Sequence, residues 1–253
     1  MLSSFAMHWD FAVILIILAV AVPLLGRRRV RQLMLLPATT KTDRLVLYAS
    51  TLAFQWIAVA VILWRTSARG IRAAQLGLAL PKPSLTIAAA ILLAVLFLAN
   101  QLTSLRRMAL PALDPQNLLV QLARKLFPQD HSERMAFFAL VVTVAICEEL
   151  IYRGFVQRVF QDWSGDDALV GIAASALFFS LAHLYQGRRG LISTLIVGVL
   201  FSAVRDVTGS LLAPVFAHFV TDLTVGILAP LRMRELTGSE VKAAEGVDSG
   251  EGI

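Results

Sequence analysis

Long apolar stretches, separated by short polar connections, run through most of the chain. A helix needs about 20 apolar residues to cross a bilayer, and it satisfies its own backbone hydrogen bonds there. The pattern therefore predicts an all-α fold, a polytopic transmembrane helical bundle of seven spans. The predicted spans lie at about 10–26, 45–64, 84–105, 135–158, 168–185, 190–207 and 210–231.

The connection between the third and fourth spans, residues 106–134, is long enough to hold an eighth helix. Within it, LLVQLARKLF (118–127) has apolar residues at helical spacing with Arg124 and Lys125 between them. This pattern predicts a short amphipathic helix in the membrane interface. We expect residues 1–232 to form a single membrane domain, with a motif-bearing core at about 135–225. The polar tail, 233–253, is predicted to be disordered.

Composition and charge support the same class of protein. The chain is 57% hydrophobic and 16% charged, whereas soluble domains are about a quarter charged. The net charge of +6 comes from basic residues between the apolar stretches, which indicates cytoplasmic loops beside anionic lipid rather than nucleic-acid binding. Their distribution favours an outside N-terminus and a cytoplasmic C-terminus. The composition indicates a bacterial cytoplasmic (inner) membrane protein.

Several ionisable residues interrupt the later apolar stretches, where charge is expensive and usually functional. Glu149 and Arg153 are four residues apart and share a helix face, so they are predicted to pair. Glu148 lies about 100° around that helix and points elsewhere. The other residues of this kind are His183, His218 and Asp222, the last two again four apart.

A carboxylate and two histidines from different helices form a set suited to hydrolysis. A glutamate can act as general base toward water, and another donor can stabilise the oxyanion. The same residue types also suit a zinc site, although the H-E-x-x-H spacing is absent. Structural roles stay open as well, because an intramembrane histidine often makes a helix–helix hydrogen bond. Phe179 by itself would indicate packing.

Three motifs occur in order along these stretches: E-E-x-x-x-R (148–153), F-x-x-x-H (179–183) and H-x-x-x-D (218–222). In this the chain resembles the CAAX protease and bacteriocin-processing family of intramembrane proteases, also called the abortive-infection family. That family includes the Ras-converting CAAX endopeptidase. The resemblance covers about residues 135–225, and the first three predicted spans carry no matching motif.

The resemblance implies a helical core with a cavity in which a peptide is cut. It assigns Glu148 to water activation with His183 as partner, and His218 with Asp222 to the oxyanion site. Glu149, Arg153 and Phe179 take supporting positions. No metal cofactor is favoured; the alternative is zinc on Glu148, His183 and His218. Asp222 stands where the family more often has asparagine, and an ionised aspartate cannot donate a hydrogen bond. It must therefore be protonated or orient His218.

The predicted function is an intramembrane endopeptidase that hydrolyses a peptide bond in a membrane-associated protein or peptide by glutamate-activated water. Prenylated substrates are not expected in a bacterium. One alternative is a non-catalytic peptide-binding or bacteriocin self-immunity protein on the same fold. Another is an ion-coupled transporter, although the sequence shows no internal repeat; Pro214 is expected to break the seventh span.

Overall fold

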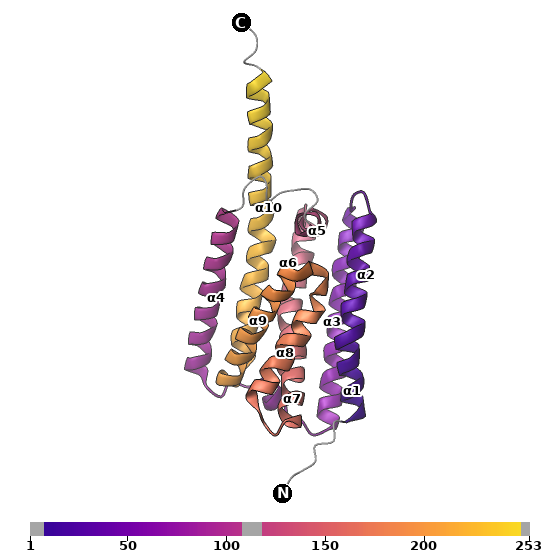
Figure 1. Ribbon diagram of the computed structural model, residues 1–253, viewed down its shortest axis with the longest axis vertical. Coiled ribbons are helices and arrows are strands. Elements are labelled where there is room, and N and C mark those ends of the chain that lie inside the picture. Colours follow the sequence, from indigo (N-terminus) through magenta and orange to yellow (C-terminus); the bar gives the residue numbers. More distant parts are fainter. Residues whose placement is uncertain (1–7, 108–117, 249–253) are drawn as a thin grey trace.

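The computed structural model describes residues 8–107 and 118–248, and within these ranges the secondary structure is helical except for one isolated β-bridge between Leu78 and Ser210. Six of the described helices are long and apolar enough to cross a membrane. They are Trp9–Leu35, Lys41–Ala68, Pro83–Arg106, His131–Trp163, Leu184–Thr208 and Leu212–Arg232. The predicted all-α polytopic bundle is confirmed, and the chain is an integral membrane protein (Figure 1).

The first long helix extends further than the sequence analysis predicts. It consists of α1 (Trp9–Ile16), the π-helical turn η1 (Ile17–Ala21) and α2 (Val22–Leu35). The basic run at residues 27–31, expected in a loop, lies on α2. The helix ends before Leu36, whose backbone is extended because Pro37 follows it.

Two long helices follow α2. The helix α3 (Lys41–Ala68) starts at a capping box in which Thr40 and Asp43 satisfy each other's backbone N–H groups. The helix α4 (Pro83–Arg106) starts on a proline, which is favoured in a first turn. Between them, η2 (Ala73–Leu76) leads to Gly77, whose carbonyl accepts a 2.8 Å hydrogen bond from the Leu211 N–H.

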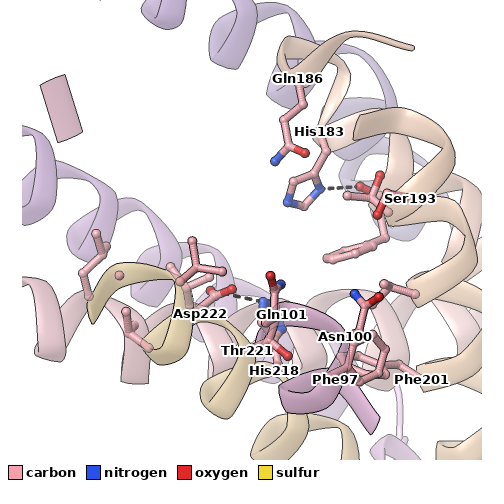
Figure 2. A pocket seen from close by; sticks show the side chains of 18 of the residues that line it. Phe97, Asn100, Gln101, His183, Gln186, Ser193, Phe201, His218, Thr221 and Asp222 are labelled. Carbon is pink, nitrogen blue, oxygen red and sulfur yellow. Dashed lines mark hydrogen bonds and ion pairs between the residues drawn. The ribbon is translucent and has the colours of Figure 1, made fainter. Parts of the chain in front are cut away.

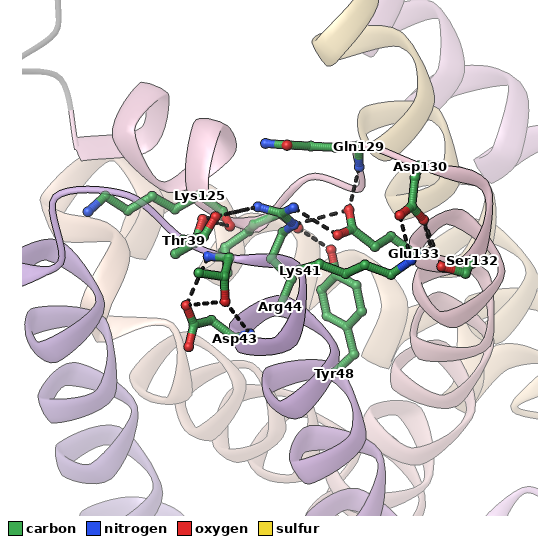
Figure 3. Close-up of polar contacts among 12 residues, drawn as sticks. Thr39, Lys41, Asp43, Arg44, Tyr48, Lys125, Gln129, Asp130, Ser132 and Glu133 are labelled. Atoms are coloured by element: carbon green, nitrogen blue, oxygen red, sulfur yellow. Dashed lines mark hydrogen bonds and ion pairs between the residues drawn. The ribbon is translucent and has the colours of Figure 1, made fainter.

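The predicted amphipathic helix is present as α5 (Leu118–Leu126), followed by α6 (His131–Glu149). Its position in the membrane interface stays a prediction. A polar network ties this connection to the start of α3 (Figure 3). In it, Arg44 binds Glu133, and the Tyr48 hydroxyl donates to the Leu126 carbonyl.

The helix α6 continues through the π-helical segment η4 (Leu150–Val156) into α7 (Gln157–Trp163). Every residue of η4 is buried. It packs beside α3, α8 and η2, so the EExxxR motif lies in the middle of the bundle. Gly154 permits this packing, because an added Cβ atom would lie 3.1 Å from the Leu76 carbonyl oxygen.

The predicted span 168–185 is a shorter helix, α8 (Ala168–Ala182), which ends just before His183. After η5 (Leu184–Gln186) come α9 (Gly187–Thr208) and α10 (Leu212–Asp248). Pro214 lies in the first turn of α10 and does not break it, contrary to the prediction. The helix α10 extends past the other helices in Figure 1, into the tail predicted to be disordered. Disorder of that tail stays a prediction.

Candidate functional site

Glu149, Arg153 and His218 form the buried centre of the site. Arg153 donates to Glu149 Oε1 at 3.0 Å, as the four-residue spacing predicts, and neither side chain is exposed. His218 of α10 donates from Nδ1 to the same oxygen at 2.8 Å. The second motif carboxylate therefore joins α6 to α10, a contact that the sequence analysis did not predict.

The chain changes helix type at this point. Glu149 is the last residue of α6, and Arg153 lies within the π-helical turn η4. Such wider turns are frequent at functional sites. Glu148 and Glu149 both lie on α6, just before this turn, and point about 100° apart, so Glu148 faces α3 whereas Glu149 faces α10.

His218 lies between two carboxylates. Its Nε2 atom is 3.5 Å from Asp222 Oδ2, one turn further along α10. Glu149 is fully buried, whereas the Asp222 side chain is 37% exposed. This contact suits the second role considered for Asp222, which is to orient the imidazole rather than to donate to an oxyanion.

Phe179 contacts three of the motif residues, which is more than the packing role its sequence position suggests. The Arg153 guanidinium lies over its ring, 4.1 Å from the centroid. The ring centroids of Phe179 and His183 are 4.6 Å apart, and those of Phe179 and His218 are 6.1 Å apart. Its carbonyl accepts a 2.8 Å hydrogen bond from His183 Nδ1, which leaves Nε2 of that ring as the acceptor in the neutral form.

Glu148 makes a different set of contacts. Its Oε1 atom accepts a 3.1 Å hydrogen bond from the Gln55 amide of α3, and its Oε2 atom is buried with no partner among the described residues. No hydrogen bond or ion pair joins Glu148 to His183 in the described part of the chain, although they were expected to be partners. Glu148 is the sequence neighbour of Glu149, which contacts His218, so Glu148 lies close to the site.

A cavity of about 530 Å³ opens beside these residues. His183, His218 and Asp222 line it, and Glu148 and Glu149 do not. Figure 2 shows His183 on one side and the His218–Asp222 pair on the other. The rest of the lining is mainly apolar, with no lysine or arginine among the described residues. The cavity therefore suits an uncharged, largely apolar stretch of peptide.

Some polar residues of the site were not predicted. Gln55, Asn100 and Gln101 are polar amides within apolar helices. The sequence signal for them was a polar residue interrupting an apolar stretch, in LAFQWIA (52–58) and LFLANQL (96–102). Uncharged amides are a weaker signal than ionised side chains, because they interrupt a span at lower energetic cost.

Glu148, His183 and His218 were named as ligands only for the zinc alternative. In the described ranges, no group of three or more His, Cys, Asp or Glu side chains is placed to hold an ion. Glu148 in particular binds Gln55 rather than either histidine. Zinc on Glu148, His183 and His218 stays a prediction, as the alternative to a metal-free site.

Comparison with known protein families gives one match. Residues 131–224 match the family model described as type II CAAX prenyl endopeptidase Rce1-like. Comparison with curated proteins and with solved structures finds no match. The matched segment begins at α6 and includes all three motifs, and its family supports a peptidase role. The match agrees with the family resemblance predicted from the motifs, and it covers residues 131–224, which is less than half of the chain.

Proposed function

We propose that this protein is an intramembrane endopeptidase that hydrolyses a peptide bond in a membrane-associated protein or peptide. The observation that carries the proposal is the combination of one cavity and one uncommitted carboxylate oxygen. His183, His218 and Asp222 line an apolar intramembrane cavity. Glu148 lies one helical turn beyond the lining residue Val144, and its buried Oε2 atom has no partner among the described residues.

In the proposed reaction, Glu148 takes a proton from water, and the water oxygen attacks the peptide carbonyl carbon. The same proton then passes to the leaving amine as the carbon–nitrogen bond breaks. His183 presents Nε2 to the cavity and helps to position the water. His218, held in orientation by Glu149 and Asp222, donates from Nε2 to the oxyanion, and the two carboxylates stabilise the imidazolium form.

The proposal requires a movement of Glu148. Its carboxylate faces Gln55 here, so it must turn toward His183 when a peptide occupies the cavity. Catalytic hydrogen bonds often form only once substrate is bound. Gln55→Leu should release Glu148 from α3 and preserve cleavage, whereas Gln55→Glu should repel the carboxylate toward the cavity or disrupt the local fold.

A glutamate mechanism of this kind needs no metal ion. Its test is the activity of purified protein with and without EDTA, together with metal analysis of the same sample. Activity that withstands chelation supports the proposal. Activity lost with EDTA and restored by zinc would replace it with the zinc alternative on Glu148, His183 and His218.

The second candidate function is peptide binding without catalysis, as in a self-immunity protein. The observation in its favour is that Glu148 does not line the cavity and is held by Gln55. In that case Glu148 variants would retain the biological effect, whereas substitutions that fill the cavity would remove it.

The deciding experiment can be done before any substrate is identified. Wild type, Glu148→Ala and the control Thr103→Val are expressed at matched levels in the native host, and new peptide termini in the membrane proteome are identified by mass spectrometry. Thr103 is exposed and does not line the cavity. Termini present with wild type and Thr103→Val but absent with Glu148→Ala support proteolysis and identify substrates. Identical termini in all three samples would favour the binding protein.

A further inference from the structure

Two neighbouring amides on α4, Asn100 and Gln101, line the cavity that contains His218 and Asp222. Neither amide has a hydrogen-bond partner among the described residues. Figure 2 shows both side chains on the side of the cavity where His218 and Asp222 lie. They belong to the N-terminal half of the chain, outside the family match at residues 131–224.

The other polar groups of the lining are largely committed to hydrogen bonds. The hydroxyls of Thr194 and Thr221 donate to backbone carbonyls within their own helices. The amide of Gln186 donates to the Tyr185 hydroxyl at 3.3 Å. Ser193 is uncommitted, but Figure 2 shows it on the His183 side. Among the described lining residues, Asn100 and Gln101 are therefore uncommitted donors on the side of the cavity where His218 and Asp222 lie (Figure 2).

Aromatic contacts fix this part of α4 against the site. The rings of Phe97 and Phe201 meet edge to face with centroids 5.4 Å apart. Phe201 in turn contacts the His218 ring at 6.1 Å. Gln101 lies one helical turn beyond Phe97, on a helix that packs along α10. The amides are thus carried by a rigid element, as a preorganised donor must be.

A peptide in this cavity needs donors for its carbonyl groups, and the described lining residues include no lysine or arginine to supply them. Asp222, when ionised, only accepts. We propose that Gln101, assisted by Asn100, donates a hydrogen bond to the scissile carbonyl oxygen of the bound peptide, which supplies the amide donation that Asp222 cannot. This inference rests on the proposed peptidase function and makes the two amides substrate-contacting residues of that site.

The variants for the test are Gln101→Leu, Gln101→Glu and Asn100→Leu, with Thr103→Val as the control on the same helix. For a peptide identified from the proteome, Gln101→Leu should lower kcat by about a hundredfold, the usual effect of losing one oxyanion donor. Gln101→Glu, of almost equal size, should be no better, because it replaces the donor with a second acceptor. Asn100→Leu should have a smaller effect, and Asp222→Asn should restore part of the activity of Gln101→Leu.

Full kcat in Gln101→Leu, in a protein whose cleavage still depends on Glu148, would overturn this inference while leaving the peptidase function intact. A second readout does not depend on cleavage. A fluorescent Leu/Ala-rich peptide is titrated against Glu148→Gln protein in lipid nanodiscs, with and without Gln101→Leu. Weaker binding in the double variant supports the amide contact even if no cleavage is found, whereas unchanged binding together with unchanged kcat excludes it.

Discussion

Two buried arginine–glutamate pairs lie in this bundle, and they are satisfied to very different degrees. Arg44 of α3 and Glu133 of α6 form a bidentate pair at 3.1 and 2.7 Å (Figure 3). Arg44 also donates to the Thr39 carbonyl, and Glu133 accepts from the Gln129 N–H. Arg153 and Glu149 share one contact at 3.0 Å.

The second pair keeps polar atoms without partners among the described residues, namely Arg153 Nε and Nη2 and Glu149 Oε2. The aromatic faces of Phe179 and Phe201 and the imidazole of His218 contact this pair instead. A saturated pair can only hold two helices together. An incompletely satisfied one, connected to a histidine that lines a cavity, can respond to what binds there. We therefore interpret the first pair as structural and the second as part of the site.

Breaking the first pair should have the largest effect on stability. Arg44→Met leaves Glu133 buried without its cation, which should lower the free energy of unfolding by about 3–5 kcal/mol. The double variant Arg44→Met/Glu133→Met should recover most of this loss, because it removes both buried charges. Unfolding in detergent measures the stability of the single and the double variant. In both variants, activity per folded molecule should match wild type. Loss of activity without loss of stability would mean that this pair is not purely structural.

Breaking the second pair should destabilise less and inactivate more. In Arg153→Met, His218 still donates to Glu149. The free energy of unfolding should therefore fall by about 3 kcal/mol, the lower end of the range expected for a broken buried pair. Arg153→Lys should rescue little, because an ammonium group does not stack as a planar guanidinium does on Phe179. Comparing the unfolding and cleavage of the two variants tests this. If Arg153→Lys behaves as wild type, the aromatic contact is unimportant.

The contact between the Arg153 guanidinium and the Phe179 ring can be tested separately from the ion pair. Phe179→Leu removes the cation–π contact but retains the backbone carbonyl that accepts the hydrogen bond from His183. We expect the free energy of unfolding to fall by about 1–2 kcal/mol. The control is Phe178→Leu, because Phe178 packs on Phe160, whereas the cation–π contact with Arg153 and the ring contact with His183 belong to Phe179. Cleavage should fall in Phe179→Leu beyond the change in stability, and not in the control. Equal effects of both variants would assign Phe179 to packing only.

The smallest effect is expected at the periphery of the first pair. A hydrogen bond from Lys41 holds the pKa of Asp130 below its ordinary value, and Asp130 also caps α6. Because its pKa is lower in the folded state, Asp130 stabilises above its unfolded pKa, and this contribution is lost as the pH falls below about 4. Asp130→Asn keeps the cap but removes the charge. Its unfolding midpoint should therefore vary less with pH in that range than that of wild type.

Much of the site was predictable because its contacts are local in sequence. The four-residue spacings predicted the Glu149–Arg153 and His218–Asp222 pairs, and both are present. Periodicity also predicted α5 and the apolar helices. The shortened α8 was less predictable, because apolar composition continues past its end at Ala182.

The contacts between helices could not be predicted from the sequence alone. Arg44 and Glu133 lie 89 positions apart, and each was expected just outside the start of a span, where charged residues are common. The Glu149–His218 contact depends on the packing of α6 against α10, and the π-helical turn η4 has no local sequence signal that we recognised. Which of two adjacent carboxylates meets the histidine is set by that packing.

The most direct test of the account compares purified wild type with Glu148→Gln, using a peptide found in the proteome experiment and thermal unfolding of the same samples. Glutamine retains the size of Glu148 and its hydrogen bond to Gln55 but cannot take a proton from water. We predict that cleavage is lost while the unfolding temperature stays within a few degrees of wild type. Cleavage at the wild-type rate by a folded Glu148→Gln protein would contradict the glutamate mechanism.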